Sequence, residues 1–209
     1  MIKLSRFVGK VSWLPLFLVV ACCTGCAQLE QWTKPTVQGL VVAPSFTPDR
    51  LVVDGIDRVV VKNLASDIKV NPDALSPEVV AVLRDKRNEI KIKPGSRYVV
   101  HVTLLSNSVT KRTDDLDPDI YKYVTRTVKV NYVITDSMDA DAEVWSGIIE
   151  TSDETSASYK REKKQKKSDK VLDAVIESMT KSETYPYPEP PVFDTTLRWN
   201  FEGFALNLP

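Results

Sequence analysis

The chain has 209 residues, of which 43% are hydrophobic and 27% are charged, a composition that suits a folded domain with an apolar core. Lys and Arg together number 28, as do Asp and Glu, and this balance argues against a nucleic-acid-binding protein, which would normally be basic. The length predicts a single globular domain.

Residues 1–21 have the layout of a secretory signal peptide. Lys3, Arg6 and Lys10 form a positively charged start without acids, and an uncharged apolar run follows at 11–21. This run is shorter than the stretch of about 20 apolar residues that a transmembrane helix needs. We therefore expect cleavage of this segment; the alternative is a short membrane anchor that stays uncleaved.

All three cysteines of the chain directly follow the apolar run, at positions 22, 23 and 26. No histidine or further cysteine stands nearby to complete a zinc site. The stretch Leu18-Val19-Val20-Ala21-Cys22 resembles the lipobox of bacterial lipoproteins, in which the cysteine thiol is acylated and the peptide is cut before it. The resemblance implies lipid attachment at Cys22. Thr24-Gly25-Cys26-Ala27 also resembles a lipobox, so Cys26 is the alternative attachment site.

The same resemblance implies where the protein resides. The residue after the modified cysteine is Cys23 or Ala27, and neither is the Asp that marks inner-membrane retention in enterobacterial lipoproteins. We therefore expect an outer-membrane lipoprotein facing the periplasm, held by several acyl chains because one chain binds membranes only marginally. Residues 22–36 are interpreted as the lipidated cysteine and tether, and residues 37–209 as one periplasmic domain.

The first half of that domain predicts two strands and a helix. Apolar, β-branched runs at 37–43 and 57–64 are typical of strands. A helix is expected over the stretch that ends at residue 90, with Ser76 as its N-cap and Pro77 at its first helical position.

Three long strands are expected next, at 97–110, 123–136 and 142–152. The middle one alternates most regularly, as a strand with one buried face does. Residues 111–121 and 153–167 interrupt this pattern and are interpreted as long loops.

Two helices are expected to close the chain. The stretch at 168–182 and the stretch beginning at Phe193 both carry apolar residues at helical spacing, and the Pro-rich segment 185–191 predicts an extended connector between them. The predicted order is ββαβββαα. It corresponds to an α+β fold, a mainly antiparallel sheet of about five strands covered by two or three helices on one face.

The central strands carry a family resemblance. A strand that ends in Asp136, a short turn, and a following strand with the pair Trp145-Ser146 resemble an α/β module of envelope lipoproteins, the kind found in LpoB, CsgG and the amino-terminal domain of TolB. The resemblance implies a fold and a periplasmic setting, and it names no ligand.

Residues that could catalyse a reaction are scarce. The single histidine, His101, is predicted on the strand face opposite Tyr98 and Val100, and a structural role is favoured over general-base catalysis. Asp115, Asp117 and Asp119 have a spacing seen in calcium loops, but a glycine and a terminal Glu are missing, so an acidic turn is favoured. We therefore expect no enzyme activity, no metal and no cofactor.

A basic run around residue 160 is a candidate contact with anionic lipid or an acidic partner. The alternative is a solvated loop. The run comprises Lys160, Arg161, Lys163, Lys164, Lys166 and Lys167.

Taken together, the sequence predicts a membrane-anchored lipoprotein with a non-catalytic binding or scaffold domain in cell-envelope assembly or maintenance. We expect an envelope protein as its partner and no nucleic acid. The alternative is an accessory lipoprotein subunit of a transport or secretion complex.

Overall fold

The computed structural model describes residues 35–65, 70–161 and 185–209. They form a five-stranded sheet with the strand order β1-β5-β4-β3-β2. The strands are β1 (Thr36–Val42), β2 (Ile56–Asn63), β3 (Tyr98–Leu116), β4 (Asp119–Asp136) and β5 (Ala142–Lys160). All neighbouring pairs are antiparallel except β2 and β3, which are parallel. The predicted α+β fold with a mainly antiparallel sheet is confirmed.

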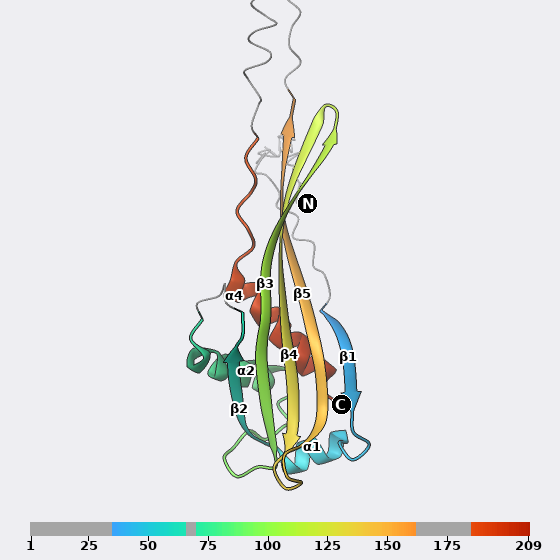
Figure 1. The fold of residues 1–209 in the computed structure, drawn as a ribbon, viewed down its shortest axis with the longest axis vertical. Helices are drawn as coiled ribbons and strands as arrows, with labels where there is room; N and C mark the ends of the chain where they lie inside the picture. Colours follow the sequence, from blue (N-terminus) through green and yellow to red (C-terminus); the bar gives the residue numbers. More distant parts are fainter. Residues whose placement is uncertain (1–34, 66–69, 162–184) are drawn as a thin grey trace, which may run out of the picture.

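Three helices are found among the described residues: α1 (Pro48–Asp54), α2 (Pro72–Lys86) and α4 (Phe193–Asn207). Both α2 and α4 lie behind the sheet in Figure 1, and α1 lies at its lower end. The helix expected at 168–182 falls outside the described residues.

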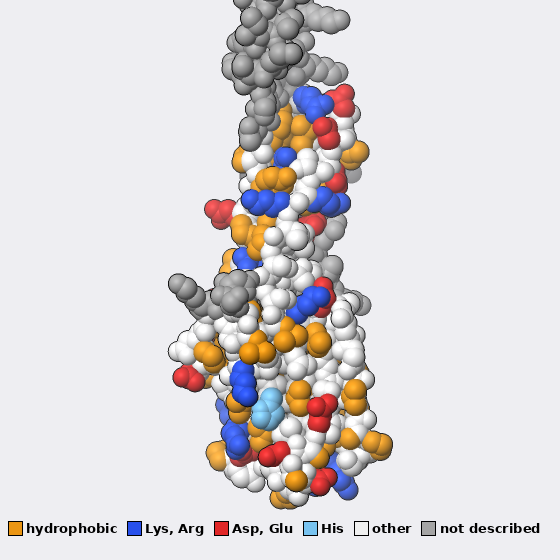
Figure 2. All heavy atoms as spheres, viewed as in Figure 1, with side chains coloured by type: hydrophobic (Ala, Val, Ile, Leu, Met, Phe, Trp, Pro, Cys, Tyr) orange, Lys and Arg blue, Asp and Glu red, His pale blue; other side chains and the backbone are white. Residues whose placement is uncertain are grey.

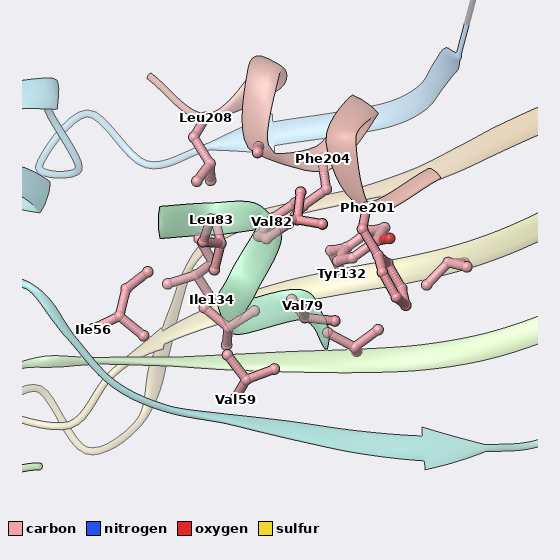
Figure 3. Packing of buried hydrophobic residues seen from close by; sticks show 14 of the residues in the cluster. Ile56, Val59, Val79, Val82, Leu83, Tyr132, Ile134, Phe201, Phe204 and Leu208 are labelled. Atoms are coloured by element: carbon pink, nitrogen blue, oxygen red, sulfur yellow. The ribbon is translucent and has the colours of Figure 1, made fainter. Parts of the chain in front are cut away.

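The core lies between the sheet and helices α2 and α4. Tyr132 stacks on Phe204 with ring centroids 4.2 Å apart, and Trp145 meets the same ring edge-on at 5.4 Å. Figure 3 shows the α2 side chains Val79, Val82 and Leu83 inserted between α4 and the sheet. Of the apolar stripe expected in the final helix, Leu197, Phe201 and Phe204 are at most 1% exposed and Phe193 is partly buried, while Leu208, directly after the helix, is 6% exposed.

Helix α2 begins earlier than the sequence predicted. Asn71 is the N-cap, since its side chain accepts a hydrogen bond from the Asp73 N–H at 3.1 Å, and Pro72 takes the first helical position. The expected N-cap, Ser76, lies inside the helix, where its hydroxyl donates to the Val59 carbonyl at 2.7 Å and joins α2 to β2. The prediction was wrong because two Pro-containing start signals occur within one turn and a half.

The two expected loops are largely strand. Residues 111–116 and 119–122 continue β3 and β4 to a tight turn at 117–118, and residues 153–160 continue β5 beside them. The alternation of apolar and polar residues that predicts a strand is lost here, because polar residues stand at most of the positions that are apolar in the body. The backbone ladder that extends from the body determines the conformation instead.

Helix α4 is fixed to the sheet by a buried amide. The Asn200 side chain is 0% exposed; it accepts from the Tyr132 hydroxyl at 2.7 Å and donates to the Ile149 carbonyl at 2.8 Å. At the end of the helix, the Arg87 guanidinium donates to the Leu208 carbonyl at 2.9 Å. A cation at this end also complements the helix dipole. These contacts hold α4 in one position along the sheet.

Candidate binding surface on the three-stranded arm

Beyond the body, strands β3, β4 and β5 continue as a three-stranded arm, defined here as residues 106–116, 119–128 and 151–160 (Figure 1). Among the described residues, β1 pairs with β5 only as far as Glu150 and β2 pairs with β3 only as far as Leu104. The arm is therefore much narrower than the body. A register shift between Leu104 and Ser106 marks the place where it begins on β3.

The Pro-rich segment 185–192, here called the strap, lies on the helix side of the arm. The Thr155 hydroxyl donates to the Glu189 carbonyl at 2.6 Å, and the Tyr159 hydroxyl donates to the Pro186 carbonyl at 2.9 Å. Arg126 Nε donates to the Pro191 carbonyl at 2.6 Å. The extended connector that the prolines predicted is thus bound along the arm through its backbone carbonyls, which an extended proline-rich chain leaves free.

Tyr187 is 37% exposed, and its side chain contacts three residues of the arm. Its hydroxyl lies 2.8 Å from the Thr113 hydroxyl, and the ammonium groups of Lys111 and Lys122 lie 5.2 and 4.6 Å from its ring centroid. The pKa of Tyr187 is lowered from its ordinary value, because the hydrogen bond with Thr113 and the charges of Lys122 and Lys111 favour the phenolate. Two basic residues and a tyrosine are therefore grouped on this face.

The opposite face of the arm carries a second aromatic group. Tyr121 and Tyr123 stack with centroids 6.4 Å apart, and the Arg112 guanidinium lies 4.2 Å from the Tyr123 centroid. Figure 2 views the sheet from this side and shows apolar or aromatic, basic and acidic side chains interleaved along the arm. The arm thus presents tyrosines and cations on both faces.

The tip of the arm combines an exposed apolar side chain with paired charges. Leu116 is 64% exposed next to the turn. Arg161 forms an ion pair with Asp115 at 2.7 Å and lies 3.7 Å from Asp117. The carboxylates whose sequence spacing resembles a calcium loop therefore lie at the turn between β3 and β4, where they pair with a guanidinium.

The structure describes two members of the predicted basic run. Lys160 is the last residue of β5, and Arg161 follows it at the tip of the arm. Lys163, Lys164, Lys166 and Lys167 lie outside the described residues, as do both candidate lipid-attachment sites, Cys22 and Cys26.

His101 lies on the body, on the sheet face opposite the helices, as predicted. Its Nε2 is 3.3 Å from the Thr135 hydroxyl. The pKa of His101 is lowered because it is partly buried and because Lys62 and Arg58 repel the protonated form. Within residues 35–65, 70–161 and 185–209, no three His, Cys, Asp or Glu side chains gather closely enough to hold a metal ion.

An open groove of about 410 Å³ runs between α2 and α4. Val82 and Phe201 contribute apolar surface to it, and Glu78, Asp194 and Arg198 contribute charge. These polar groups come from exposed helix surfaces. The groove offers a contact surface of mixed apolar and charged character.

A charged cluster joins loops at the end of the body farthest from the arm. Arg97 donates to both carboxylate oxygens of Asp136, with distances down to 2.6 Å, and to Asp54 at 3.2 Å. These bonds lower the pKa of Asp136, and the Met138 N–H contributes further. The cluster fastens the β4–β5 turn to the end of α1, so its role is structural.

Comparison with protein-family models and with curated proteins gives no match for this sequence. Among solved structures, a PelC dodecamer from Paraburkholderia phytofirmans is 16% identical, with 56% of this chain and 81% of that chain covered and a TM-score of 0.38. Lipoprotein GNA1162 from Neisseria meningitidis is 13% identical, with 60% and 94% covered and a TM-score of 0.33. A minor lipoprotein from Acinetobacter baumannii is 8% identical, with 72% and 85% covered and a TM-score of 0.27. Bacterial lipoproteins are thus among the structures similar to this chain. Identities and scores this low do not establish a function.

The described helices include none that is both long enough and apolar enough to cross a bilayer.

The sequence analysis did not predict that five of the seven tyrosines of the chain gather on the arm and its strap: Tyr121, Tyr123, Tyr159, Tyr185 and Tyr187. Their dense spacing at 121–123 and 185–187 was the available signal.

Proposed function

We propose that this chain is an outer-membrane lipoprotein, anchored through acyl groups on Cys22 or Cys26, whose periplasmic domain binds an envelope protein without catalysing a reaction. The observation that carries the proposal is the position of the cysteines. All three lie within residues 22–26, directly after an apolar run, and none occurs in the remaining chain. A lipid-attachment site needs a thiol at that place and nowhere else.

The geometry of the described domain is compatible with a binding role. Its most distinctive surface is the arm, where tyrosines, lysines and arginines are exposed on a rigid ladder of strands. Tyr and Arg are enriched in protein interfaces because they combine large contact area with polar groups. The partly buried His101 lies on the body, away from the arm, and its Nε2 is 3.3 Å from the Thr135 hydroxyl.

The decisive test is the intact mass of the protein purified from membranes of expressing cells. Wild type is compared with Cys22→Ser and with Cys26→Ser. A chain that begins at one of these cysteines and carries acyl groups supports the proposal, and the variant that loses the modification locates the anchor. An unmodified chain, or one that begins elsewhere, contradicts it.

Partner binding is tested separately by affinity capture from detergent-solubilised membranes. The matched control is a variant with Arg112→Ser and Tyr123→Ser, which removes the cation and its aromatic partner from the outer face of the arm. Capture of an envelope protein by wild type and not by this variant supports a binding role for the arm. Co-purification of a whole transport or secretion complex would favour the accessory-subunit alternative.

A further inference from the structure

The polypeptide enters the described domain from the side on which the arm extends. β1 begins at Thr36, opposite Glu150, and runs away from the arm to Val42, opposite Trp145. β5 runs in the other direction and continues past Glu150 into the arm. The described chain therefore begins, at Pro35 and Thr36, on the side of the sheet from which the arm extends.

This entry point is fixed by packing against α4. A Cβ atom on Gly203 would lie 2.6 Å from the Pro35 Cβ, so the glycine is what allows the chain to cross the helix here. Any larger residue would displace Pro35. The greatest distance between the lipid anchor and the domain therefore depends on the number of residues between the modified cysteine and Pro35.

The extended tether and the arm have similar lengths. The tether after Cys26, residues 27–35, spans at most about 30 Å when fully extended, and the tether after Cys22 spans about 45 Å. The part of β5 in the arm, residues 151–160, rises about 33 Å. The arm is thus about 3 Å longer than the fully extended tether after Cys26 and about 12 Å shorter than the one after Cys22, so its tip can reach the depth of the lipid-bearing cysteine in either case.

The chemistry of the outer part of the arm suits the lipid headgroup layer. Tyrosines gather there on both faces, and Tyr is enriched at membrane–water interfaces because its ring is apolar and its hydroxyl is polar. Lys111 and Lys122 lie against the Tyr187 ring and can meet lipid phosphates, whereas Arg112 on the opposite face pairs with Asp114 at 3.1 Å. Leu116 exposes an apolar side chain at the tip, and Arg161 pairs with the neighbouring Asp115.

From the position, the reach and the chemistry together, we propose that the tip of the arm contacts the headgroup layer of the bilayer in which the protein is anchored. The arm then holds the body away from the membrane and leaves the groove between α2 and α4 and the far-end loops open to periplasmic partners. This inference rests on the proposed lipid anchor.

The test uses the full-length acylated protein in vesicles of phosphatidylethanolamine and phosphatidylglycerol that contain a lipid with a headgroup nitroxide, which quenches nearby tryptophan fluorescence. Leu116→Trp places a probe at the tip. Met138→Trp is the matched control, because Met138 is 75% exposed and lies at the opposite end of the body. The wild-type protein supplies the background from its own tryptophans. Both substitutions lie at exposed positions, so both variants should fold.

We expect the probe at position 116 to lose about half or more of its added fluorescence, and the probe at position 138 to lose little, since interfacial tyrosines hold the tip at the headgroup depth. Acylation is verified first by intact mass. If the protein is acylated and the two probes are quenched equally, or neither is quenched, the contact is overturned while the lipid anchor stands. If the protein carries no acyl group, the proposed function fails, and the inference fails with it.

Discussion

The body and the arm are built from the same three strands and are stabilised in different ways. In the body, β3, β4 and β5 are covered by helices, and side chains such as Trp145 and Phe204 are 0% exposed. Most of the arm is instead covered by the strap, through hydrogen bonds such as the one from Thr155 to Glu189, and α4 reaches only its base, where Asn200 bonds to Val128 and Thr151. Burial of apolar side chains therefore stabilises the body, whereas the arm is stabilised mainly by the backbone hydrogen bonds between its strands. Changes in the body should therefore lower global stability, and changes in the arm should leave it nearly intact.

The largest effect is expected for Phe204→Ala. The substitution removes the ring that stacks on Tyr132 and meets Trp145, and it leaves a cavity that these rigid neighbours cannot fill. We expect a loss of about 3–5 kcal/mol in the free energy of unfolding, measured by urea denaturation. Tyr123→Ala in the arm is the control, with an expected change of less than about 1 kcal/mol. Equal losses in the two variants would contradict this, because they would show that the arm contributes as much to the free energy of unfolding as the body does.

A smaller loss is expected for Asn200→Ala. The change leaves the Tyr132 hydroxyl and the Ile149 carbonyl without their buried partner. Unsatisfied buried groups of this kind cost about 2–3 kcal/mol in unfolding free energy. Asn207→Ala, which removes an amide bond to the Gly203 carbonyl on the same helix, serves as a control with an expected change below about 1 kcal/mol. If both variants unfold at the same urea concentration, α4 is not held by Asn200.

The charged cluster at the far end predicts a pH-dependent effect for Asp136→Asn. Because the folded-state pKa of Asp136 is depressed by Arg97, its contribution is present above the unfolded pKa of about 3.9 and is lost as pH falls through the folded value. We expect the variant to be less stable by about 1–2 kcal/mol at neutral pH. The difference from wild type should shrink below pH of about 4. Urea denaturation at several pH values measures this, and a difference that is constant with pH would contradict it.

The smallest global effect is expected for Tyr187→Phe. The change removes the hydrogen bond with Thr113 and keeps the ring between Lys111 and Lys122. We expect a global change below about 1 kcal/mol, together with faster amide hydrogen exchange in the strap and in the arm strands beneath it. Tyr121→Phe on the opposite face is the matched control and should leave exchange in the strap unchanged. Unaltered exchange in the Tyr187→Phe protein would mean that the prolines alone hold the strap in place.

Much of the body could be predicted because its sequence repeats a physical pattern. In β4, Val130, Tyr132 and Ile134 alternate with polar residues, and all three are fully buried. The spacing from Leu197 to Leu208 likewise predicted the buried face of α4. The outer part of the arm offers a weaker signal, because polar and aromatic residues occupy both of its faces at 111–116 and 153–160, and residues 111–121 and 153–167 were interpreted as loops.

The sequence by itself therefore determined the fold class and the apolar faces of the body, because both depend on composition or on periodicity along one segment. Only the tertiary structure decided the length of the arm, the position of the strap and the place at which Pro35 packs on α4. These features depend on backbone pairing and packing between segments far apart in the chain, such as Pro35 on Gly203 or Tyr187 against Thr113, and no single segment encodes such a contact.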